Sequence, residues 1–106
     1  MYITLRPRTE LDGKLREVLG SNNVYYQPPE SMKIKYPCII YDREMIDARY
    51  ADNKTYSAVN RYDVTIISKD PDFPLFDSFI FMFPMCSLNR AYTYDNLSHY
   101  SFTLYY

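Results

Sequence analysis

The sequence predicts an α+β fold in which about five strands form a mixed or antiparallel sheet and two helices pack on one face, giving two layers. Two segments carry apolar residues at helical spacing, and the other segments are short and rich in β-branched and aromatic residues. The 13 Tyr and 6 Phe favour sheet surfaces and protein interfaces. A chain of 106 residues fits one domain, which we place at 1–106.

The first third of the chain predicts a helix followed by a short strand. Thr9 is a suitable N-cap, and Gly20 is suited to the left-handed conformation that ends many helices. The strand covers 24–26 and ends at two prolines, which lack backbone donors, so we expect it at or near a sheet edge. The apolar positions of the helix recur near helical spacing: Leu11, Leu15, Val18 and Leu19.

The middle of the chain predicts two strands with a polar segment between them. The second strand runs from Met32 to Tyr41 and is interrupted at Pro37. Residues 42–56 are polar and contain a turn signal, so we expect a long hairpin tip or a loop. The third strand, 57–68, alternates more clearly than any other and has one face that is more apolar than the other.

The last third predicts a helix and a hairpin. The helix starts near Pro74 and stops at Pro84, because proline is costly inside a helix. Its apolar stripe consists of Phe76, Phe79, Ile80 and Phe83. Strands at 85–93 and 99–106 flank a turn at 95–96. Two helices cannot cover both faces of such a sheet, so the opposite face needs a partner.

Charge and composition exclude several classes of function. The formal net charge of -1, from 12 basic and 13 acidic residues, gives no broad electrostatic footprint for nucleic acid. Cys38 and Cys86 lie in apolar runs and are expected to be reduced core residues. No apolar stretch approaches the ~20 residues that span a bilayer, and the N-terminus lacks the features of a secretion signal. We therefore expect a soluble product made in a cytoplasm.

Catalytic chemistry finds little support. His99 is the one histidine, and with Cys38 and Cys86 it makes only three metal ligands at irregular spacing, whereas a structural zinc site takes four. We assign no catalytic, cofactor or metal residue and expect no enzyme. Two alternatives stay open: a monomeric ligand-binding domain, and a metal-dependent nuclease or small hydrolase built on His99 and the carboxylates of the polar segment, Asp42, Glu44, Asp47 and Asp52.

A set of strand segments extends over most of the chain, at 24–29, 36–41, 61–67, 69–72 and 96–105. In sequence and spacing these segments resemble the tail terminator (tail completion) proteins of tailed bacteriophages. The resemblance implies a hexameric ring that caps the tail tube, stops tube polymerisation and helps to join the tail to the head. The implied partners are copies of the chain, the tail tube protein and head-completion or neck proteins, in a virion assembled in the host cytoplasm without a membrane or cofactor. DNA would only pass through the lumen.

A closed ring requires two different patches on each subunit that meet head to tail. Basic residues alternate with acidic ones in the polar segment, which favours a subunit contact over a metal site, with mixed charge setting the register. A head-completion or neck adaptor protein is the alternative within the same virion setting. The predicted inter-subunit or tube-contacting residues, which lie outside the resembling segments, are Arg43, Glu44, Asp47, Arg49, Tyr50, Asp52 and Lys54.

Overall fold

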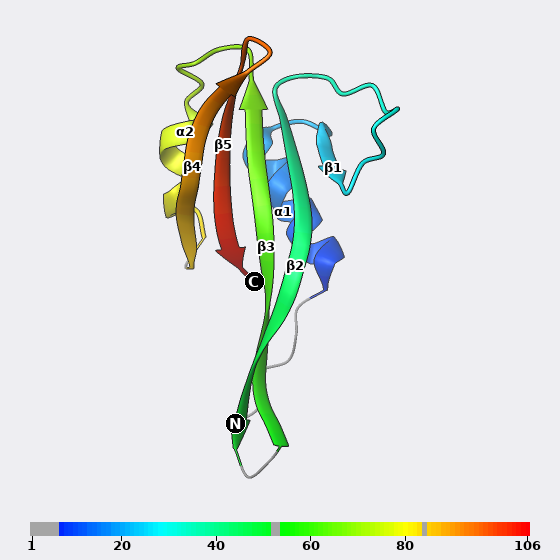
Figure 1. Ribbon diagram of the computed structural model, residues 1–106, viewed down its shortest axis with the longest axis vertical. Helices are drawn as coiled ribbons and strands as arrows, with labels where there is room; N and C mark the ends of the chain where they lie inside the picture. The colour runs from blue at the N-terminus through cyan, green and yellow to red at the C-terminus, as the bar shows by residue number, and fades with distance from the viewer. Residues whose placement is uncertain (1–6, 52–53, 84) are drawn as a thin grey trace.

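Five strands form one mixed sheet accompanied by two short helices, which confirms the predicted α+β class (Figure 1). This computed structural model describes residues 7–51, 54–83 and 85–106, and the side chains of these residues outside 45–59. The predicted order of helices and strands is also confirmed. The elements are α1 (Arg8–Leu19), β1 (Val24–Tyr26), β2 (Cys38–Ala51), β3 (Lys54–Ser68), α2 (Leu75–Ser78), the 3-10 helix η1 (Phe79–Phe81), β4 (Cys86–Tyr94) and β5 (Leu97–Tyr105).

The strands lie in the order β1-β2-β3-β5-β4. β1 is parallel to β2, and every other neighbouring pair is antiparallel. β1 is therefore an edge strand, as its prolines predicted, and β4 forms the opposite edge. The turn between β4 and β5 has positive φ at Asp95 (54°) and Asn96 (60°), the conformation of tight two-residue hairpins.

Several boundaries differ from the sequence prediction by a few residues, and three of these differences have a clear physical reason. Pro7, not Thr9, occupies the N-cap of α1, where proline fits because the first helical turn leaves its N–H groups unpaired. The second strand begins at Cys38 rather than Met32, whose side chain is exposed and gains nothing from a strand conformation. The second helix is shorter than predicted, since after Ser78 the chain tightens into η1.

The largest difference concerns residues 42–56, where a hairpin tip or a loop was predicted. The hairpin is correct, but the segment is not a loop: β2 and β3 stay paired down to the rung that joins Ala51 and Lys54. A strand ladder satisfies backbone groups whatever the side chains are, so polar composition did not prevent pairing. The hairpin extends the molecule along its longest axis, and the overall dimensions are 51 × 27 × 23 Å (Figure 1).

The core lies on the sheet face formed by one alternating set of strand residues. α1 inserts Leu11 and Leu15 into this core, and Phe79 packs on Phe102 with ring centroids 4.9 Å apart. The ring of Phe76 stacks on Tyr100 at 4.1 Å and 12°. The strand residues of this core face include Val24, Ile39, Tyr41, Tyr62, Val64, Ile66, Tyr100, Phe102 and Leu104.

A polar network fixes α1 to β2. The hydroxyl of Tyr41 donates to Asp12 Oδ2 at 2.5 Å and accepts from Arg8 at 3.0 Å. Asp12 also receives a 2.5 Å hydrogen bond from Arg16 Nε, and Arg16 continues to the carbonyl oxygen of Val24 at 3.3 Å. The helix is thereby tied to the first two strands through charged groups that are all hydrogen-bonded.

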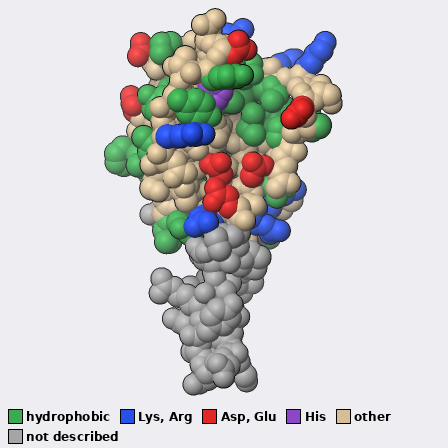
Figure 2. Space-filling view, in the orientation of Figure 1, with side chains coloured by type: hydrophobic (Ala, Val, Ile, Leu, Met, Phe, Trp, Pro, Cys, Tyr) green, Lys and Arg blue, Asp and Glu red, His purple; other side chains and the backbone are tan. Residues whose placement is uncertain are grey.

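The other alternating set forms what we call the open face, the face toward the viewer in Figure 2. Its side chains are more polar, and most are half-buried or exposed, although Cys38, Ile67 and Ser101 are buried. Its described residues include Ile40, Asp42, Arg61, Asp63, Thr65, Arg90, Tyr92, His99, Thr103 and Tyr105.

Candidate interaction surfaces

The projecting part of the β2–β3 hairpin, residues 42–51 and 54–60, is named the ribbon. β1 pairs with β2 only as far as Tyr41, and the β5 ladder on β3 ends at Arg61, with one further bond of 2.9 Å from the Tyr106 N–H to the Asn60 carbonyl. Beyond these positions no described strand flanks the ribbon on either side. An isolated two-stranded hairpin is marginally stable in water, so the ribbon is suited to contact another surface.

The ribbon carries all but one of the predicted contact residues. Glu44 accepts an ion-pair contact from Arg61 Nε at 3.1 Å, and Arg43 is exposed. Asp52 lies outside the described residues. The remaining four are placed by backbone register: Asp47 opposite Val59, Arg49 opposite Ser57, Tyr50 opposite Thr55, and Lys54 opposite Ala51.

Two carboxylates face each other across strands on the open face. Asp42 is the register partner of Asp63, and Asp63 accepts a 2.8 Å hydrogen bond from the hydroxyl of Ser101. Burial, and then the charge of Asp63, raises the pKa of Asp42. Acidic side chains gather at the middle of this face in Figure 2. The two carboxylates repel each other, and a cationic group from another molecule would reduce this repulsion.

An aromatic stack occupies the β4 side of the open face. The His99 ring lies on Tyr92 with centroids 4.8 Å apart and 11° between planes, and the Arg90 guanidinium sits 4.7 Å from the Tyr92 centroid. His99 Nδ1 is 3.0 Å from the carbonyl oxygen of Leu97. The single histidine is thus held by its neighbours in the sheet.

Among the described residues of the hydrolase alternative, His99 is not brought close to Asp42, the register partner of Asp63, while Asp52 lies outside the described residues. His99 is the register partner of Ile67, four positions along β3 from Asp63, which corresponds to about 13 Å at 3.3 Å per residue. Cys38 lies one strand further on, opposite Ile67, and both cysteines are free thiols. Burial raises the pKa of Cys86 to about 11. Within the described residues, no three His, Cys, Asp or Glu side chains are grouped as a metal site requires.

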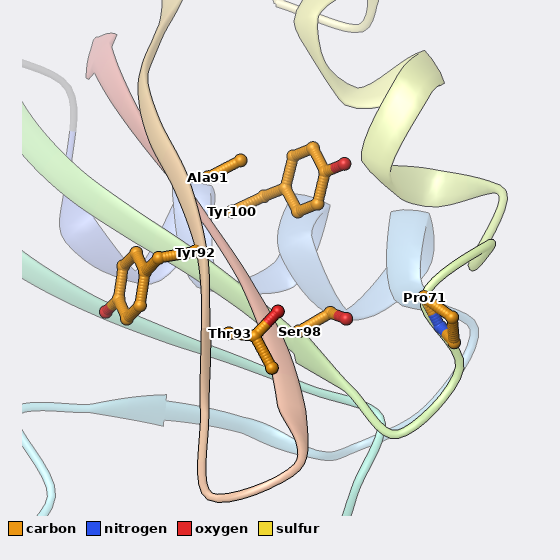
Figure 3. Close-up of a pocket in the computed structure, with 6 residues that line it drawn as sticks. All are labelled: Pro71, Ala91, Tyr92, Thr93, Ser98 and Tyr100. Atoms are coloured by element: carbon orange, nitrogen blue, oxygen red, sulfur yellow. The ribbon is translucent and has the colours of Figure 1, made fainter.

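A shallow hollow of about 240 Å³ lies between the β4–β5 hairpin and the loop before α2 (Figure 3). None of its lining side chains is a carboxylate, an imidazole or a thiol. Its volume is below the ~300–1,000 Å³ typical of small-molecule sites. Tyr92 points to the other side of β4 from Ala91 and Tyr100 (Figure 3). The lining residues are Pro71, Ala91, Tyr92, Thr93, Ser98 and Tyr100.

An exposed apolar patch at the start of β4 was not predicted from the sequence. Phe81 is 86% exposed and Met85 57%, while Met82 and Leu88 are each exposed to nearly half. The sequence did contain a signal for this patch, because Phe81 and Met82 are apolar but lie outside the apolar stripe predicted for the second helix. Large apolar side chains gathered on a surface commonly mark association sites.

Comparisons with models of known protein families and with curated proteins find no match for this chain. No helix among the described residues combines the length and apolar character needed to cross a membrane. The features of the described chain that bear on function are therefore the ribbon, the sheet edges and the apolar patch.

Proposed function

We propose that this chain is a structural subunit of virion assembly: a tail terminator that forms a ring on the tail tube, ends tube polymerisation and helps to join the tail to the head. The observation that carries the proposal is the ribbon. It projects from the small sheet domain without a flanking strand among the described residues, and it bears the alternating charges of the predicted contact segment. The resemblance of the strand segments to tail terminators supports the same reading.

The ring requires a surface that docks on the tube and a surface that docks on the next subunit. A ribbon that reaches beyond the domain can touch a neighbour without bringing the two bodies into contact. Its mixed charge contributes more to the register of the contact and to the choice of partner than to binding affinity. The near-neutral chain also suits a conduit for DNA, because phosphate contacts through many Lys and Arg side chains would retain the DNA.

Tail length in particles made without this chain tests the proposal. Loss of a terminator gives overlong tails, whereas loss of a head-completion or neck adaptor protein gives heads that leak DNA. Added purified chain should restore normal tails to extracts that lack it. Tails of normal length in particles without the chain would contradict the proposal.

A shortened chain tests the role of the ribbon. Asp47 and Val59 are register partners, and the backbone groups of Val59 face β2 because the carbonyl oxygen of the next residue, Asn60, faces β5. Residues 48–58 can therefore be replaced by Asn-Gly, a sequence suited to a two-residue hairpin turn. We expect this variant to fold, as judged by circular dichroism and cooperative unfolding, and to fail to restore tail length. A matched control reverses the charges of Glu44 and Arg61 together, which preserves their ion pair and the ribbon and should retain function.

A further inference from the structure

The outer edge of β4 is open to pairing with another strand. β4 contains nine residues, and nearly all of them are exposed. Natural sheets protect such edges with proline, with several charges or by covering them. β4 contains no proline and only one charged residue, Arg90, and its single irregularity falls near its start, between Leu88 and Arg90. The strand is therefore equipped to extend the sheet.

The turn geometry identifies which backbone groups point outward. Tyr94 and Leu97 flank the two-residue turn, and such flanking residues form a hydrogen-bonded pair. Hydrogen-bonded and non-hydrogen-bonded pairs alternate along an antiparallel ladder. Tyr92 therefore faces inward to β5, whereas the N–H and C=O groups of Ala91 and Thr93 point away from the sheet.

A matching edge exists on the opposite side of the same molecule. β1 covers β2 only up to Tyr41, so residues 42–51 present a second edge, of ten residues against nine in β4, that no described strand flanks. The antiparallel steps from β2 through β3 and β5 to β4 make β4 run opposite to β2. A second copy in the same orientation thus places its β2 antiparallel to β4.

The charges on the two edges are complementary. Asn60 directs its carbonyl oxygen to Tyr106, so its register partner Ile46 directs its backbone groups outward. Antiparallel overlap of β4 with residues 42–51 would pair outward Ala91 with Ile46 and therefore place Arg90 of one copy opposite Asp47 of the next. A two-fold pairing of β4 with β4 is disfavoured, because in full overlap its central residue, Arg90, would meet its own copy.

We infer that the outer edge of β4 binds the unflanked β2 edge of a second copy of this chain, so that the sheet continues from subunit to subunit in one direction. The exposed apolar patch beside the start of β4, formed by Phe81, Met82, Met85 and Leu88, enlarges the contact. The interface is heterologous, which permits a ring to close. The inference deepens the proposed function by naming the surfaces that join the subunits, and it rests on that proposal for the expectation that copies associate.

Light scattering on the full chain across a concentration series measures the association. Ala91→Pro removes an outward N–H and places a ring in the path of the partner strand, without removing a bond to β5. For Ala91→Pro, we expect the protein concentration at which half of the chains are assembled to be at least about 10-fold higher than for wild type. Ala91→Thr, which retains the N–H and suits a strand, should assemble like wild type. Circular dichroism checks that both variants fold.

A charge exchange gives an independent test. Arg90→Glu and Asp47→Arg should each weaken association about 3- to 10-fold by setting like charges against each other, and the double variant should recover most of the loss. A wild-type chain that stays at 12.7 kDa throughout overturns the inference, as does a closed two-fold dimer. If Ala91→Pro and the charge variants all assemble like wild type, the inference is also overturned. Tail length tests the proposed function separately.

Discussion

Replacing Tyr41 with phenylalanine removes one hydroxyl from the network that holds α1 on the sheet. That hydroxyl donates to Asp12 at 2.5 Å and accepts from Arg8 at 3.0 Å, and the Tyr41 side chain is fully buried. A hydrogen bond to a charged group contributes about 1.5–3 kcal/mol. Because Asp12 keeps Arg16 at 2.5 Å, we expect a loss near the middle of that range, about 2 kcal/mol in the free energy of unfolding.

A second tyrosine provides a matched control for this change. Tyr62 is equally buried on the core face, but its hydroxyl has no hydrogen-bond partner in the described part of the chain. Removing a buried hydroxyl that bonds nothing relieves a desolvation cost. Tyr62→Phe is therefore expected to change the free energy of unfolding by less than about 0.5 kcal/mol, or to stabilise the fold.

Chemical denaturation with circular dichroism gives both values from one protocol. For a domain of this size, 2 kcal/mol corresponds to a fall of roughly 10 °C in Tm. If Tyr41→Phe were as stable as wild type, or Tyr62→Phe lost as much as Tyr41→Phe, the account of how α1 is held would be wrong.

The remaining predictions concern backbone and charge. Gly20→Ala should lower the free energy of unfolding by about 1 kcal/mol, because φ at this position is +78°. Gly13→Ala should raise it by about 0.5–1 kcal/mol, because Gly13 lies inside α1 with open space around it. Thermal melts that give both changes the same sign would contradict this. Although burial opposes the effect, hydrogen bonds from Tyr41 and Arg16 lower the pKa of Asp12 below 3.8. Its stabilising contribution is thus complete above the unfolded-state pKa and is lost as pH falls through the lower folded value, so Asp12→Asn should flatten the acid limb of a stability–pH curve. Asp42→Asn removes the repulsion from Asp63 and should stabilise the monomer by a few tenths of a kcal/mol at pH 7, measured by urea denaturation; a loss of stability would refute the repulsion.

The order of elements and most strand positions could be predicted because local signals set them. The apolar spacing of Leu11 and Leu15 marks the helix, and the alternation of Tyr62, Val64 and Ile66 marks the buried face of β3. These patterns act within a few residues, so they can be read without a partner strand. Likewise the positive φ of Gly20 follows from a glycine placed directly after the last apolar position of the helix.

The candidate surfaces could be predicted only in part. Polar composition and a turn signal between 42 and 56 predicted a hairpin tip or a loop, and the hairpin is correct, but Asp63, Arg90 and Tyr92 were not among the predicted contact residues. Their importance depends on which strand lies beside which. Asp42 and Asp63 are 21 positions apart in sequence and become neighbours only when β2 pairs with β3 in this register.

The sequence by itself determined an α+β chain with two helices, an aromatic core and a near-neutral charge, because propensity and periodicity act locally. Only the tertiary structure decided the strand order, the parallel placement of β1 and the open edges of β4 and β2. Strand pairing depends on hydrogen bonds between distant segments and on the burial of one shared face. Neither can be recognised from the residues of a single segment. The surfaces on which the proposed assembly depends are of this second kind.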